Sequence, residues 1–272
     1  MAEFLEVLSF PFMRRALIVG VIVSLCAALL GVVLVLKRYS LIGHGLGEVG
    51  FAALALAMAL GLPPMPVAIP LVVAASFLIM YLSQRGALAG DAAIGIMAAA
   101  ALSFGVIVTS LSHGFNMDVS DYMFGSILAM SDADVALSVA LSVVVLAAFI
   151  ALYPRIFSVT FDESFARATG LNAGVYNLMI AVLTAVTIVV GMRIMGTMLI
   201  SSLIIFPALT SMRVFSRFRA VVISSAIVSV VCLSAGIMLS CLTSLPAGAG
   251  IVAVNLAAFV LFSLIGALRG AN

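Results

Sequence analysis

The chain has 272 residues, of which 65% are hydrophobic and 8% are charged. Soluble domains average about 45–50% apolar and about 25% charged residues, so this composition excludes a water-soluble globule and predicts an integral membrane protein. The charge is nearly balanced, with 12 Lys and Arg residues against 10 Asp and Glu residues, which argues against a nucleic-acid partner.

Apolar runs along the chain predict the architecture. A helix needs about 20 residues to cross a bilayer, so a chain of this length, with its loops and turns, accommodates about eight to ten spans. Nine runs lie between charges and Pro or Gly breaks, at approximately residues 16–36, 46–61, 66–83, 92–111, 133–152, 174–191, 194–210, 220–241 and 250–268. We therefore expect an all-α, polytopic membrane protein with about nine transmembrane helices in a single domain over residues 1–272.

Basic residues near the span ends predict the orientation. The positive-inside rule assigns to the cytoplasm the residues Lys37, Arg38, Arg85, Arg155, Arg167, Arg213, Arg217, Arg219 and Arg269. The C-terminus is then expected in the cytoplasm. An odd number of spans places the N-terminus outside, although a short amphipathic N-terminal helix or one miscounted span would change that side.

The segment over residues 112–134 suits an outward-facing loop, because it contains Asp residues but no Lys or Arg. Within it, the apolar stretch 122–130 is too short to span and predicts a half-helix packed against the bundle. His113 in the same segment is interpreted mainly as a solvated loop histidine.

Two polar residues in an apolar run are the first candidates for chemistry. His44 and Glu48 are four positions apart, so on a helix both project from one face, close enough to hold one cation. An ionised carboxylate inside the membrane costs about 3 kcal/mol, so Glu48 needs a partner, a water-filled path or a proton. Imidazole and carboxylate suit Zn²⁺ or Mn²⁺. The alternatives are that the two residues pair only with each other, or form a solvated helix start.

Glycines surround this pair. Residues 45–50 formally satisfy the G-x-G-x-x-G pattern of dinucleotide sites, but without a preceding strand that interpretation is rejected. Gly43 and Gly47 form a small-xxx-small pattern, which predicts close helix packing around a narrow path.

The most polar stretch on the cytoplasmic side covers residues 161–171. Asp162 and Glu163 favour the start of a short helix, and Gly170 favours its end, so we expect a one- to two-turn helix outside the membrane. Such a helix, with Phe165 and Arg167 exposed, is suited to docking a soluble partner. An ordinary solvated connector is the alternative.

Missing motifs narrow the function. The sequence has no H-E-x-x-H or G-x-S-x-G motif, which argues against an intramembrane enzyme. Lys37 is the only lysine and has no Walker A sequence around it, so ATP-driven work would require a second polypeptide. A secondary carrier that uses Glu48 as a proton-coupled ligand is the alternative that needs no ATPase.

Five blocks of the sequence together resemble the permease subunit of ATP-binding-cassette (ABC) importers for zinc, manganese and related divalent metals. The blocks are Arg38-Tyr-Ser-Leu-Ile-Gly-His-Gly-Leu-Gly-Glu48, Asp91-Ala-Ala-Ile-Gly-Ile96, Asp121-Tyr-Met-Phe-Gly-Ser-Ile-Leu-Ala-Met130, Phe161-Asp-Glu-Ser-Phe-Ala-Arg-Ala-Thr-Gly-Leu171 and Ile194-Met-Gly-Thr-Met-Leu-Ile-Ser-Ser-Leu-Ile-Ile-Phe-Pro-Ala208. They cover almost the whole chain in the expected order.

The resemblance implies a type II importer-like bundle in a bacterial plasma membrane. It also implies a homodimer of permeases, two cytoplasmic ATPase subunits and an extracytoplasmic metal-binding protein. No cofactor is expected to be bound permanently, and the transported ion would be Zn²⁺, or alternatively Mn²⁺ or Fe²⁺.

The resemblance also implies roles for particular residues. Metal ligands would be His44 and Glu48, although the family commonly has His at the second position, so Glu48 departs from the pattern. His44 favours zinc, whereas the hard carboxylate of Glu48 favours manganese or iron. Residues 162–170 would form the coupling helix that docks in the ATPase, through Asp162, Glu163, Phe165, Ala166, Arg167 and Gly170.

Overall fold

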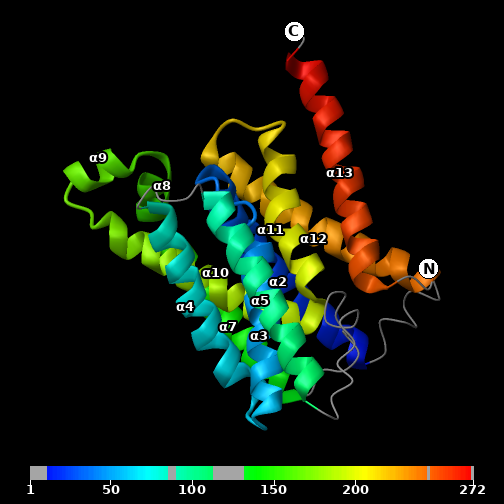
Figure 1. Ribbon diagram of the computed structural model, residues 1–272. Helices are drawn as coiled ribbons and strands as arrows, with labels where there is room; N and C mark the ends of the chain where they lie inside the picture. The colour runs from blue at the N-terminus through cyan, green and yellow to red at the C-terminus, as the bar shows by residue number, and fades with distance from the viewer. Residues whose placement is uncertain (1–10, 85–89, 113–131, 244–245, 271–272) are drawn as a thin grey trace.

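The computed structural model describes residues 11–84, 90–112, 132–243 and 246–270. Every regular element in these residues is an α-helix (Figure 1). The helices are α2 (Pro11–Leu36), α3 (Ile42–Ala59), α4 (Pro64–Gln84), α5 (Gly90–Leu111), α7 (Asp132–Ala151), α8 (Tyr153–Phe161), α9 (Glu163–Ala168), α10 (Ala173–Met195), α11 (Thr197–Met212), α12 (Phe218–Thr243) and α13 (Ala247–Gly270). His113 and the expected half-helix over 122–130 lie outside the described residues.

The helices confirm the predicted polytopic bundle. Seven of them are long and apolar enough to cross a membrane, and the bent pair of α7 and α8 brings the number to eight. The remaining predicted run, 194–210, corresponds to α11, which is apolar but shorter, with 16 residues. Each predicted run overlaps one helix of the structure.

Burial differs strongly between the spans. The helices α2, α3 and α10 are largely enclosed by their neighbours, whereas α13 lies at the edge of the bundle in Figure 1 and is exposed along most of its length. Its exposed side chains include Val260, Leu264 and Leu268. Such an apolar surface requires lipid or another protein to cover it.

The break between α7 and α8 is a feature that the sequence interpretation missed. The two helices meet at an angle of 70°. Pro154 stands at the start of α8, where its missing N–H and fixed φ end the preceding helix and begin a new one. Phe157 and Phe161 of α8 pack on Phe218, with ring centroids 5.1 and 5.6 Å apart, and thereby hold α8 against the start of α12.

The turn between α2 and α3 fixes where the helix with the candidate metal ligands begins. Arg38 has a φ of 61°, and the Tyr39 amide donates to the Leu34 carbonyl at 2.8 Å, which closes a Schellman motif at the end of α2. Helix α3 then starts at Ile42 rather than at the predicted residue 46. The glycines of this first part of α3 are used for tight packing, so tertiary contacts override their low helix propensity here.

Candidate functional site

His44 and Glu48 lie together on the first two turns of α3. The distance from His44 Nδ1 to Glu48 Oε1 is 3.8 Å. The His44 side chain is 55% exposed, whereas the Glu48 side chain is only 10% exposed. The predicted spacing on one helix face is therefore confirmed.

Glycines position this pair against two neighbouring helices. A Cβ atom added at Gly43 would lie 3.1 Å from Ile204 Cδ1, and one added at Gly47 would lie 3.2 Å from the Thr197 side chain, both on α11. On another side of α3, a Cβ at Gly45 would lie 2.5 Å from the Ile94 side chain of α5. The small-xxx-small pattern thus brings α3 close to α11, as expected.

The geometry of the pair suits a shared cation. Two ligands about 2.1 Å from a tetrahedral Zn²⁺ lie about 3.4 Å apart, so a separation of 3.8 Å needs only a small adjustment. In the part of the chain that the structure describes, no cluster of three or more His, Cys, Asp or Glu side chains could hold a metal ion. One copy therefore offers two candidate ligands, whereas zinc usually takes four.

The second candidate region forms the short capped helix that the sequence predicts. Asp162 is the N-cap of α9, and its Oδ1 accepts the Phe165 backbone N–H at 2.8 Å. At the other end Gly170 has a φ of 86°, and the Leu171 amide donates to the Ala166 carbonyl at 3.0 Å. This is a Schellman motif with glycine at its left-handed position.

Helix α9 is seated on a small apolar contact outside the main core. Ala166 is fully buried against Val159 of α8 and Ala173 of α10. Phe165 and Arg167 point away from this contact and are exposed. Figure 1 shows α9 projecting from one end of the bundle, where a soluble protein can reach it.

A polar connection links α9 to the end of α2, and the sequence interpretation did not anticipate it. Lys37 Nζ donates to Asn177 Oδ1 at 2.5 Å, and Asn177 Nδ2 donates to Glu163 Oε2 at 3.2 Å. Glu163 also accepts from Arg167 at 2.6 Å. The available signal was Asn177 itself, because an amide in an apolar span requires polar partners.

The charges in this connection are complementary. Burial alone would raise the pKa of Glu163, but hydrogen bonds from Arg167 and Asn177 and the nearby positive charge of Lys37 together lower it. Burial lowers the pKa of Lys37, and the negative charge of Glu163 opposes that shift. Asn177 therefore lies between a basic and an acidic side chain.

Comparison with known proteins places the chain in a family. Residues 9–266 match the model of the ABC 3 transport family. The chain is 28% identical over 252 residues to the high-affinity zinc uptake system membrane protein ZnuB of Haemophilus influenzae, covering 93% of this chain and 97% of that protein. It is 26% identical over 259 residues to the manganese import system permease protein ScaB of Streptococcus gordonii, covering 95% of this chain and 93% of that protein.

Solved structures share the fold. PsaBC from Streptococcus pneumoniae, in complex with Fab, superposes with a TM-score of 0.85 at 26% identity, over 96% of this chain and 94% of that one. A metal-chelate type ABC transporter in an inward-facing conformation superposes with a TM-score of 0.66 at 17% identity, over 95% of this chain and 84% of that one. The fold is thus that of a type II importer-like permease. The chain belongs to the ABC 3 transport family, the permease family of metal importers that its sequence blocks resemble.

Proposed function

We propose that the chain carries zinc into the bacterial cytoplasm, with His44 and Glu48 as the residues that hold the ion during passage. The observation that carries this proposal is the 3.8 Å pair on the first two turns of α3. An imidazole and a carboxylate on adjacent turns form half of a zinc site. Two copies of the chain around a central path would supply four ligands.

A half-site in each copy suits transport better than a complete site in one copy. A carrier must bind its ion and then release it, so ligands that separate when two subunits move apart lower the affinity at the right moment. The exposed position of His44 leaves its imidazole accessible to a second copy, while the more enclosed Glu48 depends on the bound cation to offset its charge.

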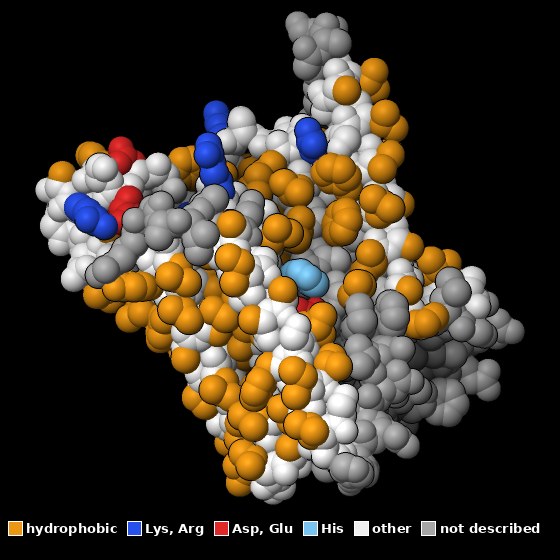
Figure 2. All heavy atoms as spheres, in the orientation of Figure 1, with side chains coloured by type: hydrophobic (Ala, Val, Ile, Leu, Met, Phe, Trp, Pro, Cys, Tyr) orange, Lys and Arg blue, Asp and Glu red, His pale blue; other side chains and the backbone are white. Residues whose placement is uncertain are grey.

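Coupling to ATP is assigned to α9. We infer that its exposed Phe165 and Arg167 enter a groove of a cytoplasmic ATPase subunit, and that an extracytoplasmic metal-binding protein delivers the ion from the other side. Lys and Arg side chains in Figure 2 gather at the end of the bundle that carries α9. By the positive-inside rule this end faces the cytoplasm, and the C-terminal end of α13 lies on the same side.

The choice of zinc rests on His44. Imidazole favours zinc, whereas the carboxylate of Glu48 is equally suited to Mn²⁺ and Fe²⁺. Relatives named for zinc and for manganese are similarly distant in sequence, so manganese and iron are the alternatives to the proposed cargo. Replacing His44 by Asp would make both ligands of the pair carboxylates. This change is expected to shift uptake from zinc towards manganese.

The proposal is tested by uptake of radioactive Zn²⁺ and Mn²⁺ into cells that lack their own importers and express the complete transporter. We expect His44→Ala and Glu48→Ala to lower zinc uptake by about tenfold or more at normal expression, because each removes a ligand. Ser103→Ala is the matched control, since its exposed hydroxyl on α5 bonds only to the Ala99 carbonyl of its own helix. Unchanged uptake in both ligand variants would refute the assignment.

The same assay separates the proposal from a proton-coupled carrier. Membership in the ABC 3 transport family already favours an ATP-driven mechanism. Uptake that continues after cellular ATP is depleted, and that stops when the proton gradient is dissipated, would favour the secondary carrier instead.

A further inference from the structure

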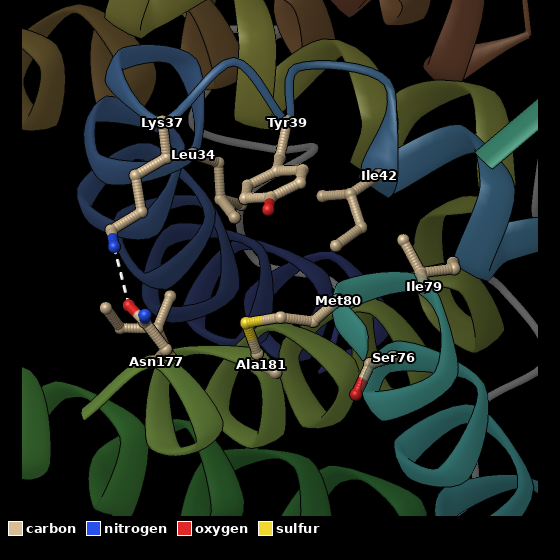
Figure 3. Close-up of a pocket in the computed structure, with 10 residues that line it drawn as sticks. Leu34, Lys37, Tyr39, Ile42, Ser76, Ile79, Met80, Asn177 and Ala181 are labelled. Atoms are coloured by element: carbon tan, nitrogen blue, oxygen red, sulfur yellow. Dashed lines mark hydrogen bonds between the residues drawn. The ribbon is translucent and has the colours of Figure 1, made fainter. Parts of the chain in front are cut away.

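The connection from Lys37 through Asn177 to Glu163, hereafter the relay, links α9 to the end of α2, shortly before the helix that carries His44 and Glu48. It begins on α9 at Glu163, crosses α10 at Asn177 and ends at Lys37, directly after α2. Figure 3 shows Lys37 reaching from the end of α2 towards Asn177 on the facing helix. Residues that are 140 positions apart in the sequence are thus tied by a single hydrogen bond.

Asn177 uses both ends of its amide in the relay. Its oxygen accepts from Lys37 and its nitrogen donates to Glu163, and the side chain is 5% exposed. A buried amide with each end bonded to an oppositely charged group is costly to separate from either one. Movement of α9 therefore pulls on Lys37 as well as on α10.

The turn after Lys37 is stiff enough to pass such a movement on. Its Schellman motif, with Arg38 in the left-handed region, fixes the path of the chain between α2 and α3. His44 follows Lys37 by seven positions and lies in the first turn of α3. A displacement of Lys37 is thereby transmitted to the helix that carries the metal ligands.

Space beside the relay permits it to move. A cavity of about 300 Å³ lies between the relay and α8, and it is lined by Lys37, Tyr39, Met80, Val159, Thr160, Phe161, Glu163 and Asn177. A fully packed interior would resist a shift of these groups, because well-packed cores deform little. The cavity leaves room for the side chains of the relay to change position.

We infer that Asn177 is a positioning residue that transmits the movement of α9 through Lys37 to the turn before α3, and so couples ATP hydrolysis to the opening of the His44–Glu48 site. This inference rests on the proposed function. The competing interpretation is that the relay only anchors α9, in which case its loss would weaken ATPase binding without separating hydrolysis from transport.

The test measures Zn²⁺ transported per ATP hydrolysed by the complete transporter, with its ATPase and binding protein, in proteoliposomes. Asn177→Leu keeps the size of the side chain and removes both hydrogen bonds. We expect it to retain hydrolysis within about twofold and to lower the transport ratio by about fivefold or more. Lys37→Met removes the hydrogen bond to Asn177 and leaves the bond from Asn177 to Glu163 of α9 in place. It is expected to give the same uncoupling.

Two further variants separate bonding from packing. Asn177→Gln keeps both bonding ends, and the neighbouring cavity has room for its extra methylene, so it should restore most of the wild-type ratio. Thr184→Val is the matched control on α10, because the buried Thr184 hydroxyl bonds only to the Ile180 carbonyl of its own helix at 2.7 Å. It should leave the ratio unchanged.

Three results would overturn the inference. The first is a wild-type ratio of Zn²⁺ transported to ATP hydrolysed in Asn177→Leu, and the second is an equal loss of that ratio in Asn177→Leu and Asn177→Gln. The third is a purified Asn177→Leu complex that has lost its ATPase subunits. The last result would make Asn177 an anchor for α9. His44→Ala in the same assay distinguishes the two proposals. If it abolishes transport while Asn177→Leu does not change the ratio, the relay alone is wrong; if His44→Ala transports zinc normally, the proposed site is wrong.

Discussion

At the scale of single residues, two left-handed positions shape the turns on which the account depends. Arg38 has a φ of 61° and Gly170 a φ of 86°, and each lies two positions after the last residue of a helix that ends in a Schellman motif. A residue with a side chain is strained at such a position by about 1–2 kcal/mol, whereas glycine is not. The turn after α9 thus has glycine at its left-handed position, which suits that conformation, whereas the turn after α2 has an arginine there.

Exchanging the residue types should change the stability of the two turns in opposite directions. Arg38→Gly is expected to raise the free energy of unfolding by about 0.5–1 kcal/mol, because relief of strain exceeds the added entropy of the unfolded chain, about 0.4–1 kcal/mol. Gly170→Ala is expected to lower it by a similar amount. Thermal unfolding of the purified permease measures both, and shifts of the same sign in the two variants would contradict this reading of the turns.

At the scale of helices, close backbone contacts hold α2 in the centre of the bundle. A Cβ atom at Gly31 would lie 2.0 Å from the backbone oxygen of Ile204 on α11, and a carbonyl in a helix cannot turn away as a side chain can. Ser225 and Ser229 of α12 add hydrogen bonds to the α2 carbonyls of Ala28 and Ser24. Helix α2 is therefore packed through its backbone on two sides.

Gly31→Ala should accordingly separate α2 from α11 and destabilise the protein by about 1–3 kcal/mol. Gly95→Ala is the matched control, since nothing lies within 4 Å of the atom it would add. The control is expected to be neutral or to gain up to about 1 kcal/mol from better helix propensity. Comparable melting temperatures for the two variants would show that α2 and α11 are not in contact at this position.

Helices were predictable from the sequence where their apolar pattern was long, and less so where they were short. All nine apolar runs became helices, but α8 was missed, because nine residues that include Arg155 and several aromatics do not resemble a span. The start of α3 was placed four residues late, since the glycines around His44 have low helix propensity and gain their stability from packing against α11.

The parts of the candidate site that could be predicted are those whose residues lie close together in the sequence. His44 with Glu48, and Asp162 with Gly170, lie within one short segment each, so helical spacing and capping preferences were sufficient. The bonds from Lys37 to Asn177 and from Asn177 to Glu163 join three separate helices or turns. No local pattern in the sequence indicates that these groups meet, because their contact depends on the tertiary fold.

At the scale of the whole molecule, one copy is an incomplete unit. It supplies only the two proposed metal ligands, and it exposes apolar side chains along α13 and on α5, where Ile96, Ile107 and Leu111 face outwards. Lipid covers part of such a surface, and the proposed second copy would cover the part beside His44. The exposed end of α9 likewise leaves Phe165 uncovered by the chain itself.

The most direct test of the account locates the ion. Crystals of the complete transporter with Zn²⁺, measured by anomalous scattering at the zinc absorption edge, should show one peak between two copies of the chain. We expect an imidazole nitrogen of His44 and a carboxylate oxygen of Glu48 from both copies at about 2.0–2.2 Å from that peak. A zinc peak in the membrane-spanning region that lies away from both residues would contradict it.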